Sequence, residues 1–320
     1  MALRDRNGLR EMARQRLETA ALDPRKLVLV YAGVSAGIML LVTGLNFLLS
    51  GQIASTGGLG GLGTRAVLET VMEVLRLAVN LLLPFWNMGY LYCTLKIVRG
   101  QNFDLKDLLA GFQNFGPVLR LTFLYSLQFL MLGILWFYPS VLVYSLSPLS
   151  APLMELMEPF VQSGTEIVLD DAMMMAATEA VMPMFIIYGV VFLVAAAPRF
   201  YNYRMAFYAL LDDPKAGARM ALGRSTQMMR GKRLDLLKLD FGFWWFYLLD
   251  ALTLALCYGD LLLKMMGITL PISAEGSYFL FYLLYLVTQL GLYVWARNTV
   301  ECTYAAGYDA MLEELAQQEG

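Results

Sequence analysis

The residues best placed to do chemistry in this chain are two aspartates inside a long apolar run. Asp240 and Asp250 lie within residues 239–258, and an ionisable side chain in a membrane-spanning segment is a functional candidate by default. A helix would place them about 15 Å apart along its axis, which suits a relay of protons or cations. The structural alternative, which we favour, pairs Asp240 with Arg233 or Lys238. Asp250 would then hydrogen-bond across a bundle of helices.

The composition argues against catalysis. The chain has no histidine among its 320 residues, and histidine is both the usual general base at neutral pH and the commonest metal ligand. Cys93, Cys257 and Cys302 share no CxxC spacing and lie in or beside apolar runs, so we interpret them as small buried hydrophobic residues. We therefore predict no catalytic residues, no metal and no cofactor, and we expect that the protein is not an enzyme.

The overall composition is that of a membrane protein. Hydrophobic residues make up 58% of the chain and charged residues 16%, whereas a soluble domain is roughly a quarter charged. Six apolar runs approach the roughly 20 residues that a helix needs to cross a bilayer. These runs should be helices, because lipid cannot satisfy the polar groups of an open backbone. They are residues 27–49, 74–98, 118–138, 180–197, 239–258 and 278–296.

Lysine and arginine are segregated between these runs. Seven of them precede residue 27 and nine lie in residues 199–238, whereas residues 146–179 contain none. Short translocated loops are poor in lysine and arginine, so we predict that the basic segments and both termini are cytoplasmic. The predicted fold is all-α and polytopic, with six transmembrane helices and amphipathic cytoplasmic helices. Its parts are a cytoplasmic N-terminal helix (1–26), a single transmembrane domain (27–296) and a cytoplasmic tail (297–320).

The N-terminal segment has the pattern of an amphipathic helix. Its apolar residues recur at helical spacing, which places them on one face. Such a helix either lies along lipid headgroups or docks on other cytoplasmic segments, and the sequence leaves both open. The residues of this face are Leu9, Met12, Ala13, Leu17 and Ala20.

Residues 199–238 predict a second amphipathic helix. Asp213 and Pro214 favour a helix start, and Gly231 favours its end. The apolar stripe between them consists of Ala218, Ala221, Leu222, Ser225 and Met229. Basic residues near an anionic membrane surface contribute about 1 kcal/mol each, and the candidates for contacting headgroups are Lys215, Arg219, Arg230, Lys232 and Arg233.

Other polar residues of the apolar runs predict local contacts. Glu73 and Arg76 have the spacing of an ion pair within a helix. Arg297 and Glu301 have it as well. Pro84 should kink the second run. Hydrogen bonds between helices are expected from Asn46, Asn80, Asn87, Gln128 and Gln289.

The segment without lysine or arginine, residues 147–179, is acidic. A vestibule that attracts cations is conceivable there. We favour a solvated cap with an interfacial helix near residues 153–160. The acidic residues of this segment are Glu155, Glu158, Glu166, Asp170, Asp171 and Glu179.

Three groups of residues resemble a known family. Near the N-terminus they are Ala13, Arg14 and Leu17, and after the second run they are Arg99, Gly100, Leu108, Gly111 and Phe112. The third group comprises Tyr203, Asp213, Pro214, Ala221, Ser225, Met229, Gly231, Lys232, Leu239, Asp240, Phe241, Phe243 and Trp244. Their order resembles the bacterial integral membrane family catalogued as domain of unknown function 975. The resemblance implies a multi-pass protein of the bacterial inner membrane and implies no activity.

Two functions remain in view. The preferred one is a non-enzymatic scaffold or accessory protein whose basic loops contact anionic lipid or another membrane protein. The alternative is a component of a small solute or ion transporter or channel that uses the intramembrane carboxylates. The segregated charge gives no reason to expect nucleic acid as a partner.

Overall fold

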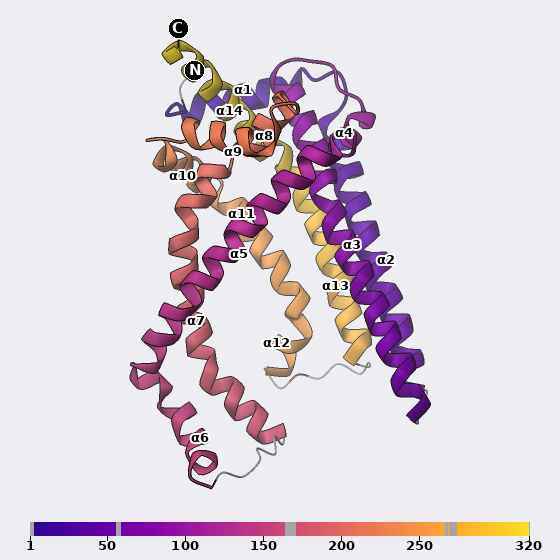
Figure 1. The fold of residues 1–320 in the computed structure, drawn as a ribbon. Helices are drawn as coiled ribbons and strands as arrows, with labels where there is room; N and C mark the ends of the chain where they lie inside the picture. Colours follow the sequence, from indigo (N-terminus) through magenta and orange to yellow (C-terminus); the bar gives the residue numbers. More distant parts are fainter. Residues whose placement is uncertain (1–2, 56–58, 164–170, 266–267, 269–273, 320) are drawn as a thin grey trace. The chain divides into compact units, whose positions relative to one another are not determined.

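A computed structural model describes residues 3–55, 59–163, 171–265, 268 and 274–319, and every regular element among them is a helix (Figure 1). Contacts within the chain divide it into two compact units. Unit 1 comprises Met1–Leu121 and Met205–Gly320, and unit 2 comprises Thr122–Arg204. The acidic residues Glu166 and Asp170 fall outside the described residues, so the prediction for that part of the outer segment stays untested.

Unit 1 contains most of the helices. They are α1 (Arg6–Glu18), α2 (Pro24–Ser55), α3 (Leu59–Val98), η1 (Leu105–Leu109), α4 (Ala110–Gln113), the start of α5 (Phe115–Ser145), α8 (Ala206–Asp212), α9 (Gly217–Met228), α10 (Arg233–Phe241), α11 (Trp244–Ala255), η3 (Leu256–Tyr258), α12 (Gly259–Met265), α13 (Ala274–Leu292), the π-helical turn η4 (Tyr293–Arg297) and α14 (Asn298–Glu319). The long helix α2 packs on both α3 and α13, and α11 packs on α13.

Unit 2 contains the rest of α5, followed by η2 (Pro148–Ser150), α6 (Ala151–Ser163) and α7 (Asp171–Tyr203). α5 and α7 contact each other through aromatic rings, such as those of Phe137 and Tyr188, and through the hydroxyl of Tyr144, which donates to the carbonyl of Ala180 at 2.8 Å. Helix α6 includes residues 153–160, where an interfacial helix is predicted. The exposed side chains of Glu155 and Glu158 fit a solvated position.

Within the described residues, five helical segments are long and apolar enough to cross a membrane: Pro24–Leu48, Phe115–Ser145, Met173–Asp212, Trp244–Leu263 and Gly276–Gln317. They correspond to five of the six predicted spans. The run 74–98 lies in α3 and is not among them. Six spans therefore stay a prediction, whereas the all-helical, membrane-compatible fold is confirmed.

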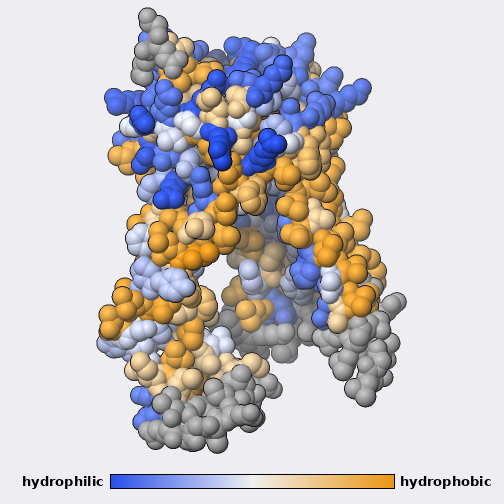
Figure 2. All heavy atoms as spheres, viewed as in Figure 1, coloured by the Kyte–Doolittle hydropathy of each residue, from blue (hydrophilic) through white to orange (hydrophobic). Residues whose placement is uncertain are grey.

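One end of unit 1 carries a layer of short helices that we call the cap: α1, η1, α4, α8, α9, α10 and α14 (Figure 1). Figure 2 shows hydrophilic residues gathered over this layer and hydrophobic ones along α2 and α3. Leu41 and Leu48 of α2 are 68% and 66% exposed, which is costly in water but not in lipid. Both termini lie at the cap end of the unit.

The segment predicted as a tail is a buried helix of the cap. Cys302, Tyr304, Tyr308 and Met311 of α14 are at most 1% exposed. The helix α1 packs on α14 and α3, and its Leu9 and Ala13 are fully buried. The structure thus places the N-terminal amphipathic helix on other cap segments, the second of the two positions that the sequence left open.

Helix α9 matches its prediction closely. A side-chain oxygen of Asp213 accepts from the backbone N–H of Ala216 at 3.2 Å, and Gly231 adopts a φ of 72° after the helix ends. This left-handed conformation favours glycine. The predicted apolar stripe is the buried face of the helix: Ala218, Ala221, Leu222, Ser225 and Met229 are all at most 7% exposed.

The fifth predicted span, 239–258, is interrupted. α10 ends at Phe241 and α11 begins at Trp244, with Gly242 between them. A Cβ atom at Gly242 would lie 1.4 Å from Nη2 of Arg10, so a larger residue here would require the arginine side chain to move. Because the helix ends here, the membrane-compatible segment starts at Trp244.

Arg99, at the end of α3, joins three elements of the cap. Its Nη1 donates to Asp212 of α8 at 2.6 Å, and its Nη2 donates to Asp309 of α14 at 2.7 Å. Tyr308 donates to the second carboxylate oxygen of Asp212 at 2.7 Å. The hydrogen bonds with Asp212 and then Asp309 raise the pKa of the Arg99 guanidinium above its ordinary value.

The first prediction concerns this cluster. Replacing Arg99 by methionine leaves Asp212 and Asp309 facing each other without a cation. We expect a destabilisation of about 3 kcal/mol, at the low end for a broken buried pair because the arginine side chain is 29% exposed. The unfolding midpoint of R99M in detergent should fall by several degrees. Arg4→Met is the matched control, since Arg4 is 84% exposed at 3.4 Å from Asp235. Equal midpoints for R99M and R4M would contradict the assignment.

Candidate functional site

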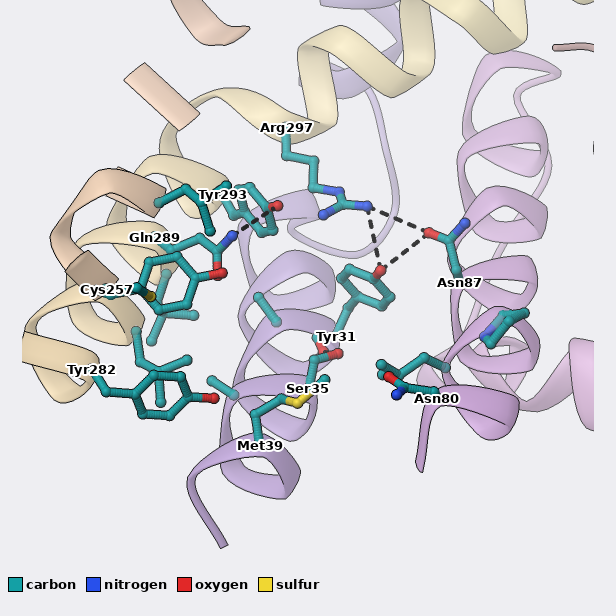
Figure 3. Close-up of a pocket in the computed structure, with 18 residues that line it drawn as sticks. Tyr31, Ser35, Met39, Asn80, Asn87, Cys257, Tyr282, Gln289, Tyr293 and Arg297 are labelled. Atoms are coloured by element: carbon teal, nitrogen blue, oxygen red, sulfur yellow. Dashed lines mark hydrogen bonds between the residues drawn. The ribbon is translucent and has the colours of Figure 1, made fainter. Parts of the chain in front are cut away.

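Unit 1 contains a cavity of about 590 Å³ between α2, α3, the α11–η3 segment and α13 (Figure 3). Its walls are mostly apolar and aromatic. A few polar groups reach it from three of these helices. They are Tyr31, Ser35, Asn80, Asn87, Tyr282, Gln289, Tyr293 and Arg297.

Arg297 extends into the cavity from η4, at the junction of α13 and α14 (Figure 3). Its Nη2 donates to the hydroxyl of Tyr31 at 3.3 Å and to Oδ1 of Asn87 at 3.4 Å. The Tyr31 hydroxyl in turn donates to the same Asn87 oxygen at 3.1 Å. Both acceptors are neutral, so these bonds orient the guanidinium without neutralising it.

Tyrosine rings surround the guanidinium. Its central carbon lies 4.4 Å from the ring centroid of Tyr293, 4.9 Å from that of Tyr31 and 5.3 Å from that of Tyr90. Cation–π contacts of this kind are worth about 2 kcal/mol when desolvated. Tyr31 is itself held by Tyr90, whose ring centroid is 4.4 Å away. The three rings form a preorganised aromatic site that holds the Arg297 guanidinium.

The Arg297 guanidinium retains unused donor capacity. Its Nε is buried and has no hydrogen-bond partner in the described part of the chain. No carboxylate of the described residues lies within ion-pair distance of it, so the predicted direct pair with Glu301 is wrong, although Glu301 still acts on the guanidinium electrostatically. The guanidinium instead extends from the end of a π-helical turn to Tyr31 and Asn87. Such turns are frequent at functional sites.

The predicted interhelical hydrogen bonds are partly found in this cavity. Asn87 accepts hydrogen bonds from Tyr31 of α2 and from Arg297. Gln289 instead donates within its own helical segment, to the Tyr293 hydroxyl at 3.2 Å, and Oε1 of Gln128 has no hydrogen-bond partner among the described residues. Pro84 lines the wall on α3. For Arg297 itself, the sequence predicts only an ion pair at the end of the sixth apolar run. The available signal was an arginine at the end of an apolar run rich in tyrosine, which periodicity alone does not distinguish from an interface anchor.

The structure does not bring Asp240 and Asp250 into one relay, because they lie on separate helices, α10 and α11. Asp240 accepts a hydrogen bond from Tyr304, whose hydroxyl is 2.6 Å from that of Tyr247. A carboxylate oxygen of Asp250 is buried and lacks a hydrogen-bond partner among the described residues. Asp250 does not line the cavity. The predicted pair Glu73–Arg76 is confirmed at 2.6 Å.

The predicted headgroup residues separate into two kinds. Lys215, Arg219, Arg230 and Arg233 are exposed. Lys232 is partly buried and pairs with Glu314 of α14, so its charge is already compensated. The structure therefore leaves four of the five candidates available to a membrane surface or a partner.

The cysteines differ in accessibility. Cys93 and Cys302 are fully buried, as predicted, and Cys257 lines the cavity. None forms a disulfide. In the part of the chain that the structure describes, no group of three or more His, Cys, Asp or Glu side chains is arranged to hold a metal ion.

The long apolar helices define an α-helical protein compatible with membrane insertion. A family model covers residues 1–296, and the chain belongs to that family, described as "Protein of unknown function (DUF975)". The resemblance seen in the sequence is thereby confirmed. Neither a curated protein nor a solved structure matches the chain.

The second prediction uses Cys257 as a reporter of the cavity. A small water-soluble methanethiosulfonate reagent should modify one thiol per folded chain, at Cys257, because Cys93 and Cys302 are sealed in the core. Intact mass before and after labelling, with a C257S control, measures this. Modification of Cys93 or Cys302 at a comparable rate, or no modification at all, would show that the cavity is not accessible as described.

Proposed function

We propose that the protein is a non-enzymatic membrane protein that binds a small organic anion in the cavity around Arg297. The observation that supports this most is the guanidinium with a buried, unpartnered Nε and no carboxylate of the described residues within reach. An unpaired charge in a membrane bundle is costly and marks a functional site by default. An anionic ligand would supply the missing acceptor and countercharge.

The lining defines the class of ligand. A cavity of about 590 Å³ falls within the range of small-molecule sites. Its apolar wall includes Leu83, Leu254 and Leu286, and its aromatic wall includes Tyr282 and Tyr285. A carboxylate or similar group at Arg297, joined to a small aromatic or apolar body, satisfies both parts of the site.

This proposal develops the transporter alternative and changes its chemistry. The sequence hypothesis relied on intramembrane carboxylates, which attract cations. The cavity instead has an arginine, which attracts anions. A scaffold has no need of such a cavity, so solute binding, alone or as a step in transport, accounts for more of the geometry.

The proposed placement follows the charge pattern. The cap contains basic segments and both termini. It lies at one end of unit 1. By the preference of basic loops for the cytoplasmic side, we place the cap in the cytoplasm and the apolar helices in the inner membrane of a bacterium. The cavity then opens among the helices below the cap.

The third prediction compares ligands of one shape and three charges. Benzoate should raise the unfolding midpoint of the detergent-solubilised protein more than benzyl alcohol does, and benzylammonium should not raise it. A charge-assisted hydrogen bond contributes about 2 kcal/mol, so Arg297→Gln should weaken benzoate binding at least about tenfold. Calorimetric titration of wild type and R297Q measures the affinities.

The neutral ligand keeps this test informative even if R297Q folds poorly. Equal stabilisation of the wild type by benzoate and benzyl alcohol would mean that Arg297 only ties helices together through its tyrosines. In that case the proposed function fails.

A second role, contact with membrane lipid or a partner through the cap, is favoured by α10 and its surroundings. Leu234, Phe241 and Trp244 are 67%, 67% and 60% exposed, beside the exposed basic residues Arg233 and Lys238. Exposed apolar and basic side chains together suit the level of lipid headgroups. This role is an accessory one and coexists with the cavity.

The fourth prediction tests the depth of α10. Nitroxide labels at Leu234→Cys and Arg219→Cys, in a C257S background and in vesicles, report collisions with oxygen and with a water-soluble nickel chelate. The label at 234 should favour oxygen and the label at 219 the nickel chelate. A label at 234 that is as accessible to nickel as the one at 219 would remove α10 from the membrane surface.

A further inference from the structure

We propose that a second cavity, at the junction of the cap and the apolar helices, binds the headgroup of a phospholipid that has both a phosphate and an ammonium group, such as phosphatidylethanolamine. The cavity measures about 500 Å³ and lies between α1, the start of α11 and η4. Its lining includes Arg10, Glu11, Arg14, Trp245 and Trp295. It is separate from the Arg297 cavity, and its test is independent of the function proposed there.

The phosphate site is built around Arg10. Its guanidinium lies 4.5 Å from the ring centroid of Phe243 and directly against Gly242. Its Nε is buried and has no hydrogen-bond partner among the described residues. Arg14 lies one helical turn further along α1, on the same face. Two guanidinium groups beside one cavity match the geometry of a phosphodiester.

The tryptophans place the cavity at the membrane boundary. The rings of Trp245 and Trp295 are 5.0 Å apart between centroids, and Trp295 is 69% exposed. Tryptophan is enriched at the interface between headgroups and hydrocarbon. Arg10 and Arg14 therefore stand at the level where a phospholipid presents its phosphate, and the acyl chains can follow the apolar surface of α11.

Glu11 distinguishes between kinds of headgroup. Phosphatidylglycerol presents the same phosphate but a neutral glycerol, which offers this carboxylate no cation. An ethanolamine headgroup instead offers its ammonium to Glu11 and to the faces of the two tryptophans. Two arginines and one glutamate thus complement one phosphate and one ammonium group with a single positive charge left over.

The test is a competition measured by native mass spectrometry on the full-length protein in detergent. Equal amounts of phosphatidylethanolamine and phosphatidylglycerol with identical acyl chains are added. The wild type should retain the ethanolamine lipid about threefold over the glycerol lipid, as expected for one exposed ion pair. Glu11→Gln should bring this ratio to about one or below while total lipid is retained. Arg14→Gln, an exposed substitution, should lower the binding of both lipids.

Lys215→Gln on α9, which is exposed and distant in the sequence from α1, is the matched control and should leave the ratio unchanged. Equal retention of the two lipids by the wild type, or an unchanged ratio in E11Q, would overturn the proposal. Soluble phosphoethanolamine added at the lipid concentration should not displace the bound lipid. Full displacement would show that the site takes the free headgroup and not a membrane lipid.

Discussion

A guanidinium that sits among tyrosine rings without a carboxylate in reach is the constraint on which the interior of unit 1 depends. Arg297 contacts Tyr31 of α2, Asn87 of α3 and Tyr293 of its own π-helical turn, so one charge holds together the three helices that form the cavity. Ring faces and neutral oxygens reduce the cost of burying this charge, and Glu301 acts on it electrostatically, but no carboxylate of the described residues pairs with it directly. The same group is therefore both a structural link and the strongest site for an anion.

The cap holds the other ends of these helices in place. Arg99 joins α3 to α8 and α14 through Asp212 and Asp309, and η1 packs so closely on α3 that a Cβ atom at Gly89 would lie 1.8 Å from the Leu108 carbonyl oxygen. The C-terminal helix α14 forms the centre of this layer. Its first residue, Asn298, bonds the hydroxyl of Tyr90 and the carbonyl of Pro24, so the cap core and the cavity wall share residues.

Much of this architecture could be predicted from sequence, for identifiable reasons. The five apolar segments can be predicted from the length of their hydrophobic runs. The buried stripe of α9 can be predicted from the helical periodicity of its apolar residues. The break at Gly242 was missed because residues 239–258 form one continuous apolar run, and the contact of Arg10 with Gly242 joins residues over two hundred positions apart. The burial of α14 was missed because tyrosine, alanine and threonine in its core carry a weak hydrophobic signal. The role of Arg297 depends on a π-helical turn, which no regular periodicity reveals.

The central claim, that Arg297 provides an anion site within the bundle, is tested most directly by locating an anion there. Crystals of the protein soaked in 4-bromobenzoate allow the bromine to be placed by anomalous scattering. The account predicts a peak in the cavity between α2, α3 and α13, with the carboxylate toward Arg297 in the wild type and no peak in R297Q. A peak of equal height in both proteins, or one found only outside the cavity, would contradict it.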